Sequence, residues 1–314
     1  MTVPAPGLRG RLVIAASALI ARLPERPLVA AAEAAGELWY RLDRRRAARA
    51  RANLRRVAAY LAETGTGSAR ARRAAGDPDA LERLVRSAFR HAVRYYLEIA
   101  RASRFDLASA MARMDIETPE TVEAALTGGR PIILLGAHFG AIEMPVVYLS
   151  SRAGDPFTAP METGADPGLA RWFATTRSRA GVRIVPITDA RRELLATLRR
   201  GASVGLIVER DLTGGGVPTP FFGHPAPIPV GPALLALETG APVYLASCRR
   251  VAGGRYIGRM DAIATPTEGS RRERMTALTG AIAAGLAALI ADAPEQWWGA
   301  FHPIWRDLDA EVAA

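Results

Sequence analysis

The sequence contains no lysine, because all 41 residues in the Lys+Arg count are arginine. Walker-type phosphate loops, Schiff-base enzymes, pyridoxal enzymes and protein kinases all use a lysine amine, so these classes are excluded. Cysteine is almost absent too, with Cys248 alone. This excludes an intramolecular disulfide and a cysteine-rich zinc site and favours a reducing compartment. No metal site is predicted, since His91, His224 and His302 lack ligand spacing.

Long apolar runs are also missing near the N-terminus. Residues 12–20 and 28–40 are largely apolar, but the sequence around Pro24 and Pro27 separates them. Each run falls short of the roughly 20 residues that a membrane-spanning helix needs. We expect residues 1–40 to form amphipathic helices on a membrane surface. Two alternatives stay open: the helices pack only against the rest of the chain, or this segment is a signal peptide.

Positive charge is concentrated in the first third of the chain. Residues 1–104 carry 21 Arg against 9 Asp and Glu, whereas residues 105–314 carry 20 Arg against 22. This excess predicts an anionic partner, and we expect an anionic membrane surface rather than nucleic acid. The basic stretch has no nucleic-acid recognition motif and few aromatic residues for stacking. The arginines expected to meet the membrane are Arg44, Arg45, Arg46 and Arg49.

The pattern of apolar residues along the chain predicts an α/β fold. Helical spacing of apolar residues fills the first 110 residues, and short apolar runs alternate with helical patterns from residue 131 onward. This alternation is typical of a mostly parallel central sheet flanked by helices. We expect one α/β domain over residues 41–314, after the N-terminal helices. The predicted strands are 131–135, 157–160, 182–187, 203–208, 243–248 and 256–263.

Active sites in such sheets collect where strands end, and two loops qualify. His138 and Glu143 follow the predicted strand 131–135. A carboxylate can orient a histidine and stabilise its protonated form, so His138 is a candidate general base and Glu143 its support. No enzyme nucleophile precedes His138 in its loop, which favours direct attack by a substrate hydroxyl. Glu209, Arg210 and Asp211 follow the predicted strand 203–208.

Residues 201–205, Gly-Ala-Ser-Val-Gly, match the G-x-S-x-G pattern of a serine hydrolase. That motif needs a strand before the serine and a helix after it. Here the order is reversed, because residues 190–200 indicate a helix and residues 205–208 a strand. An esterase or thioesterase using Ser203 or water remains an alternative class, as does a non-catalytic membrane-binding module.

Together these loops resemble the bacterial lipid A biosynthesis acyltransferase family, within the lysophospholipid and glycerolipid acyltransferase superfamily. His138 and Glu143 match its His-x4-Asp/Glu signature. The similarity is greatest to the phosphatidylinositol mannoside acyltransferase branch, which has Asp in place of Glu143. The segments that carry this similarity are Glu-Arg-Asp-Leu-Thr at 209–213, Phe-Phe-Gly at 221–223, Pro-Val-Gly-Pro-Ala at 229–233 and Glu-Thr-Gly-Ala at 238–241.

The resemblance implies transfer of a fatty acyl group from acyl-CoA or acyl carrier protein to a hydroxyl of a membrane lipid or glycolipid. No further cofactor is expected. The enzyme would lie peripherally on the cytoplasmic face of the inner membrane, and lysophospholipids and lipid-A-type acceptors are alternative substrates. By position, the residues implied for substrate binding are Glu162, Arg177, Glu209, Arg210 and Asp211, of which Arg210 and Asp211 are expected to hold either the loop or the polar headgroup in place. The residues implied for the acyl chain and its loop are Phe139, Phe221, Phe222 and Gly231, and a place in the core is the alternative for Phe221 and Phe222.

Overall fold

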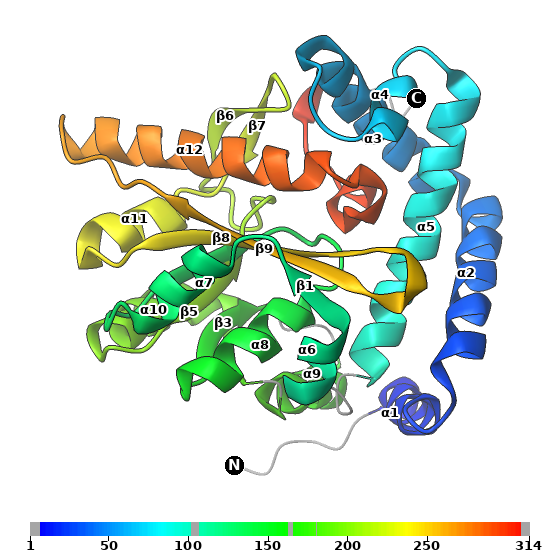
Figure 1. Cartoon of the computed structure of the whole chain (residues 1–314), viewed down its shortest axis with the longest axis horizontal. Coiled ribbons are helices and arrows are strands. Elements are labelled where there is room, and N and C mark those ends of the chain that lie inside the picture. The colour runs from blue at the N-terminus through cyan, green and yellow to red at the C-terminus, as the bar shows by residue number, and fades with distance from the viewer. Residues whose placement is uncertain (1–6, 102–106, 163–165, 180, 309–314) are drawn as a thin grey trace.

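The computed structural model describes residues 7–101, 107–162, 166–179 and 181–308. In this part of the chain a seven-stranded sheet lies between two layers of helices (Figure 1). Its strand order is β1-β9-β8-β2-β5-β3-β4, and only the β8 and β9 pair is antiparallel. This confirms the predicted mostly parallel α/β fold. The strands are β1 (Met114–Ile116), β2 (Ile133–Gly136), β3 (Phe157–Met161), β4 (Val182–Pro186), β5 (Val204–Ile207), β8 (Val243–Arg250) and β9 (Tyr256–Ile263).

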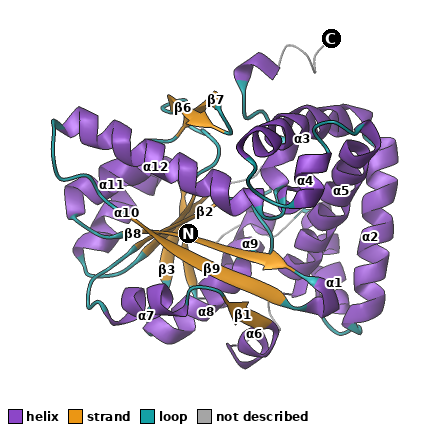
Figure 2. Cartoon of the chain, turned by 45° about the horizontal axis from the view of Figure 1, so that its top comes forward, coloured by secondary structure: helices purple, strands orange, loops and turns teal. Residues whose placement is uncertain are grey.

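Helices cover both faces of the sheet and form the N-terminal third of the chain (Figure 2). The N-terminal helices are α1 (Leu8–Ile20), α2 (Glu25–Leu42), α3 (Arg44–Thr64), α4 (Ala69–Arg73), α5 (Pro78–Arg101) and α6 (Leu107–Arg113). The later helices are α7 (Pro119–Thr127), α8 (Glu143–Ala153), α9 (Pro167–Arg179), α10 (Ala190–Arg199), α11 (Gly231–Thr239) and α12 (Arg271–Ala291). The predicted domain boundary at residue 40 falls within α2.

Strand β2 is at the centre of the sheet and is buried on both faces, as its continuous apolar sequence indicates. Successive side chains of a strand point to opposite faces. Ile133 and Leu135 therefore join a large core formed with α3, α5, α10, α11 and α12. Leu134 joins a smaller core with residues of α7 and α8, such as Met144.

Helix α2 lies along α5 at the edge of the molecule (Figure 1). Gly36 permits this close approach, because a Cβ atom there would lie 2.6 Å from the Cα atom of Arg90. Acidic side chains of α2 pair with basic side chains of α5, as Glu37 does with Arg86 and Arg90. The N-terminal helices are thus fastened to the rest of the fold.

Three local elements differ from the sequence prediction. Helix α4, which begins after the N-cap Ser68, lies within residues 65–78, whose small and polar residues predict a loop. Strand β1 was not predicted. Strands β6 (Val217–Phe221) and β7 (His224–Ile228) form a separate antiparallel hairpin. The three glycines at 214–216 favour a hairpin loop by sequence, but the turn of this hairpin is Phe222–Gly223. Both turn residues have positive φ, 47° and 73°, as a tight two-residue hairpin turn requires.

Candidate active site

His138 lies in the loop that follows β2, at the carboxyl end of that strand. Its Nδ1 atom is 2.6 Å from Oε1 of Glu209, which lies two residues beyond the end of β5. Strands β2 and β5 are parallel neighbours in which Gly136 pairs with Ile207, so their loops leave the sheet side by side. The sheet topology therefore builds the contact between this histidine and a carboxylate.

Glu209 is charged although its side chain is completely buried. Burial alone would raise the pKa of Glu209, but the adjacent His138 ring attracts the carboxylate and lowers its pKa below the ordinary value. A carboxylate only accepts hydrogen bonds, so we assign the proton of the imidazole to Nδ1. In the neutral imidazole Nε2 is then unprotonated and can accept a proton from a hydroxyl group.

The expected partner of His138 was Glu143, and here the structure differs. Glu143 is the first residue of α8, and its Oε1 atom is 3.2 Å from Nε of Arg177 on α9. The pairing of β2 with β5 brings Glu209 to Nδ1 instead. Glu143 stays at the same site, but as the counter-ion of a largely buried arginine.

Trp298 contacts His138 through both its main chain and its ring. Its backbone N–H donates to the His138 carbonyl oxygen at 2.7 Å, and the two ring centroids are 5.2 Å apart. The ring of His302 lies 4.6 Å from the same indole. Burial, together with the positive charge of Arg210, lowers the pKa of His302 to about 4, so this ring is neutral at pH 7. Neither Trp298 nor His302 was predicted to belong to the site, since no sequence motif marks them.

A cavity of about 580 Å³ opens beside His138. It lies over the face of the sheet that carries α8 and α9, which contribute Glu143, Phe173 and Arg177 to its wall. Alternate residues of the strands form its floor and are almost all apolar, as expected for one face of a sheet. These floor residues are Leu134 and Gly136, Phe157 and Ala159, Val182 and Ile184, Gly205 and Ile207, and Ala246 and Cys248.

The polar residues predicted for substrate binding have different positions. Glu162, Arg177 and Arg210 line the cavity together with His138. Asp211 does not line it: its carboxylate accepts backbone N–H groups of Thr213, Gly214 and Gly216. Asp211 therefore holds the loop after β5 in place, which is one of the two roles expected for it. The other expected role, contact with the headgroup, has no support for this residue, because it does not line the cavity.

Of the four residues expected along the acyl chain, only Phe139 lines the cavity. Phe221 and Phe222 are buried in an aromatic cluster with Trp297 and Trp305. Gly231 begins α11 and is outside the cavity wall. The structure therefore corrects the expected acyl contact of these three residues: the two phenylalanines, at the turn of the β6–β7 hairpin, are part of the core.

The arginines expected to meet a membrane lie at the start of α3. Arg44 and Arg45 are exposed. Arg46 is half-buried, pairs with Asp43 and lies over the Trp39 ring, with its guanidinium carbon 5.1 Å from the ring centroid. Arg49 is half-buried as well and lies one helical turn further on.

Ser203, the candidate nucleophile of the serine-hydrolase alternative, lies before β5 and so at the amino end of the strand. Its hydroxyl oxygen accepts the backbone N–H of Ile132, which precedes β2. His138 is at the opposite end of these two strands, about 13–17 Å away at roughly 3.3 Å per residue. Ser203 cannot therefore form a catalytic pair with His138.

In the described part of the chain one helix, α12, is long and apolar enough to cross a membrane by length and composition. Of its most apolar window 44% is buried inside the molecule, as in the core helix of a folded domain. The apolar segment Gly10–Ile20 of α1 is shorter. Among the same described residues, no three His, Cys, Asp or Glu side chains gather where they could hold a metal ion.

Comparison with known proteins places this site in a family. A profile of the bacterial lipid A biosynthesis acyltransferases matches residues 7–307. Phosphatidylinositol mannoside acyltransferase of Mycolicibacterium smegmatis is 32% identical over 252 residues, which cover 77% of this chain and 80% of the relative. The protein of the same name from Mycobacterium tuberculosis H37Rv is 32% identical over 213 residues, 65% of each chain.

Proposed function

The chain belongs to the bacterial lipid A biosynthesis acyltransferase family, and from this premise we propose that it transfers a fatty acyl group from an acyl thioester to a hydroxyl of a phosphatidylinositol mannoside. The family and its relatives make the chain an O-acyltransferase acting on glycolipids. The names of the relatives support the mannoside as acceptor. Acyl-CoA or acyl carrier protein is the proposed donor, and no other cofactor enters the reaction.

One observation supports this mechanism above all: a histidine oriented by a buried carboxylate lies at the edge of an apolar cavity. The Nδ1 proton of His138 is held by Glu209, which leaves Nε2 to face a substrate. The strand residues of the cavity floor offer hydrocarbon contacts and suit an acyl chain. Glu162, Arg177 and Arg210 line the same cavity and supply polar contacts for the acceptor.

In the proposed reaction, Nε2 of His138 removes the proton of the acceptor hydroxyl as its oxygen attacks the thioester carbonyl. The carbon–oxygen bond forms, the carbon–sulfur bond breaks, and the thiolate leaves with the proton that the imidazolium returns. Glu209 stabilises the imidazolium in between, as a carboxylate does for histidine in serine proteases. No acyl-enzyme forms in this scheme, because the acceptor itself is the nucleophile.

The first test uses labelled acyl-CoA with phosphatidylinositol mannoside in mixed micelles. His138→Ala should lower the transfer rate by roughly 10²–10⁴-fold, the range that general-base catalysis contributes. Ser203→Ala is the matched control and should retain most of the activity. Near-normal transfer by His138→Ala contradicts the mechanism, and label released as free fatty acid instead of glycolipid supports a thioesterase. Acyl carrier protein and a lysophospholipid, tested in parallel, identify the donor and the acceptor class.

We also propose that the solvent-exposed side of α1 and α2, here called their outer face, lies on the cytoplasmic face of the inner membrane. Apolar side chains are exposed along both helices and in the link between them: Leu8, Leu12, Leu19, Leu23, Leu38 and Leu42 are 42–75% exposed. The acids of residues 7–42 are Glu25, Glu33 and Glu37, and each pairs with an arginine of another helix. The outer face is thus left with apolar and basic side chains, which suit an anionic lipid surface.

The position of the basic cluster sets the orientation. Helix α2 has 18 residues and is therefore about 27 Å long at 1.5 Å per residue. It separates α1 from Arg44 and Arg45 at the start of α3. Both ends can contact one flat membrane only if α2 lies parallel to its surface, and the exposed Ala30, Ala34 and Leu38 then face the lipid.

Vesicle cosedimentation tests this orientation. Arg44→Gln/Arg45→Gln should weaken binding to anionic vesicles and change little on zwitterionic ones, because attraction by surface charge decays within about 8 Å at physiological salt. Leu12→Ser/Leu38→Ser should remove the part of the binding that resists high salt. The exposed pair Asp115→Asn/Arg255→Gln is the control. Binding that responds to neither set, or salt-sensitive binding to DNA without binding to vesicles, contradicts the proposal.

A further inference from the structure

Arg250 is a buried arginine close to the His138 loop. It ends β8, and only 2% of its side chain is exposed. Its guanidinium makes two bonds to the carboxylate of Glu98 on α5, one of them 2.7 Å long from Nε to Oε1. Nη2 also donates to the carbonyl oxygen of Gly140 at 2.9 Å. One arginine therefore joins α5, β8 and the loop that carries His138.

Stability alone does not account for this buried ion pair. Removing two charges from water costs several kcal/mol per ion, and replacing such a pair with apolar side chains of similar size is often neutral or stabilising. The feature that an apolar pair could not reproduce is the bond to the Gly140 carbonyl. Gly140 is two residues beyond His138, so this bond acts on the backbone of the candidate base.

The loop around Gly140 has little room to adjust. Gly140 has φ of 60°, and a Cβ atom there would lie 2.0 Å from the carbonyl oxygen of Cys248. The next residue, Ala141, donates its N–H to that same carbonyl at 2.8 Å, and the N–H of Gly140 donates to the carbonyl of Gln296. The backbone between His138 and α8 thus follows the end of β8 closely, and Arg250 fixes the carbonyl group of Gly140.

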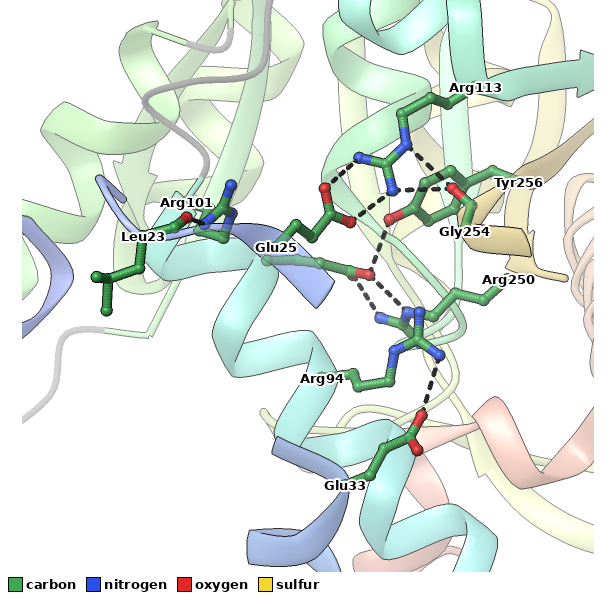
Figure 3. Close-up of polar contacts among 10 residues, drawn as sticks. Leu23, Glu25, Glu33, Arg94, Arg101, Arg113, Arg250, Gly254 and Tyr256 are labelled. Atoms are coloured by element: carbon green, nitrogen blue, oxygen red, sulfur yellow. Dashed lines mark hydrogen bonds and ion pairs between the residues drawn. The ribbon is translucent and has the colours of Figure 1, made fainter. Parts of the chain in front are cut away.

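The pair is itself held by its neighbours. The side chain of Gln296 accepts the backbone N–H of Arg250 and donates to its carbonyl oxygen. The Tyr256 hydroxyl donates to Glu98 at 3.2 Å. Figure 3 shows Arg250 and Tyr256 close together, with Arg113 beside Tyr256. These neighbours hold Arg250 and Glu98 in place, so the guanidinium keeps its contacts with both Glu98 and the Gly140 carbonyl oxygen.

We infer that Glu98 and Arg250 are positioning residues for His138: the ion pair holds the Gly140 carbonyl and so keeps the imidazole between Glu209 and the cavity. This inference rests on the proposed role of His138 as general base. A displacement of about 1 Å at a reacting group can cost roughly 100-fold in rate. Neither residue of the pair lines the cavity, so we expect their effect mainly on the turnover step and less on substrate binding.

The test replaces both charges at once, with Glu98→Leu/Arg250→Met. If the pair served only stability, this apolar substitution would leave the melting temperature and the activity near the wild-type values. Positioning predicts a folded protein in which kcat falls roughly 10–100-fold while KM for both substrates changes less than threefold. The exposed pair Asp115→Asn/Arg255→Gln removes the same number of charges and is the control.

A second readout does not depend on activity. The chain has four histidines, so the Nδ1 proton of His138 can be assigned in an NMR spectrum by its loss in His138→Gln. The hydrogen bond to Glu209 shifts this proton far downfield in the wild type, and the double variant should broaden it or move it upfield. If the wild type transfers no acyl group, the proposed function fails, and this resonance still tests positioning.

Arg250→Lys covers the case in which the double variant does not fold. Lysine keeps the charge next to Glu98, but a single ammonium cannot span Glu98 and the Gly140 carbonyl as the guanidinium does. Its kcat should fall at least fivefold with little loss of stability. Wild-type kcat together with an unchanged His138 resonance, in either variant, overturns the inference.

Discussion

The two faces of the central sheet are used differently. The face that carries α10, α11 and α12 is filled by a continuous core, in which Ile133 and Leu135 of β2 pack against helix residues such as Leu286. The opposite face carries the smaller core and the cavity of about 580 Å³. In β2, one set of alternate residues therefore packs in the core, and the other set forms part of the cavity floor. Substitutions on the two faces should separate stability from specificity.

The largest effect on stability is expected on the filled face. Leu286 of α12 is completely buried, and Leu286→Ala should lower the free energy of unfolding by about 2–5 kcal/mol, since the lost contacts leave a cavity. Leu38→Ala on the exposed side of α2 is the control and should change it by less than about 0.5 kcal/mol. Chemical denaturation measures both. Equal losses in the two variants would show that the filled face is not the main source of stability.

On the hollow face the same kind of change should alter specificity instead. Gly205 lines the cavity, and a Cβ atom there would meet nothing within 4 Å. Gly205→Leu should leave stability nearly unchanged and shorten the accepted acyl chain, with a preference shift of roughly tenfold or more toward shorter donors. Competition between acyl-CoA chain lengths measures the shift. An unchanged chain-length profile would mean that the acyl chain lies elsewhere.

At neutral pH the smallest effect is expected from His302 on the cavity side, because it changes stability only when the pH falls below about 6.5. The pKa of His302 is about 4 in the folded chain and about 6.5 when unfolded. The unfolded chain binds the proton first, so stability falls as the pH drops from 6.5 toward 4 and levels off below 4. His302→Gln should flatten this part of the curve of melting temperature against pH. Curves that stay parallel over this range would contradict the assigned pKa.

The periodicity of the sequence was enough to predict the fold. Each predicted strand corresponds to an observed one within a few residues, because β2, β3, β4, β5, β8 and β9 are short apolar runs between turn residues. The hairpin of β6 and β7 was not predicted, since prolines interrupt both strands. An isolated two-stranded sheet tolerates these prolines because each strand has a free edge.

For the candidate site, the sequence indicated His138 but not the side chains that surround it. His138 could be predicted because it follows an apolar strand. The distance along the chain to Glu143 is five residues and to Glu209 is 71, and only the order of strands in the sheet shows that the second carboxylate is the nearer one. Phe221 and Phe222 were placed at the acyl chain by their type, whereas the hairpin buries them in the core.

In the N-terminal helices, too, the composition could be predicted from the sequence but the orientation of the side chains could not. Their apolar and basic composition could be predicted, but the sequence does not show on which side of α2 Glu33 and Glu37 lie. Their pairing with Arg94 and Arg86 turns both acids toward α5. The basic and apolar character of the outer face follows from this arrangement rather than from composition.

The central claim is that His138 works with Glu209, and a comparison of Glu209→Gln with Glu143→Gln tests it most directly. Each variant replaces one carboxylate near the histidine with a neutral amide of the same shape, and kcat for labelled acyl transfer is measured at saturating donor and acceptor. Glu209→Gln should lose roughly 10²–10⁴-fold, because the imidazolium is no longer stabilised and the tautomer is no longer fixed. Glu143→Gln should lose less than about tenfold in kcat. The opposite ranking, with a larger loss for Glu143→Gln, would contradict the account.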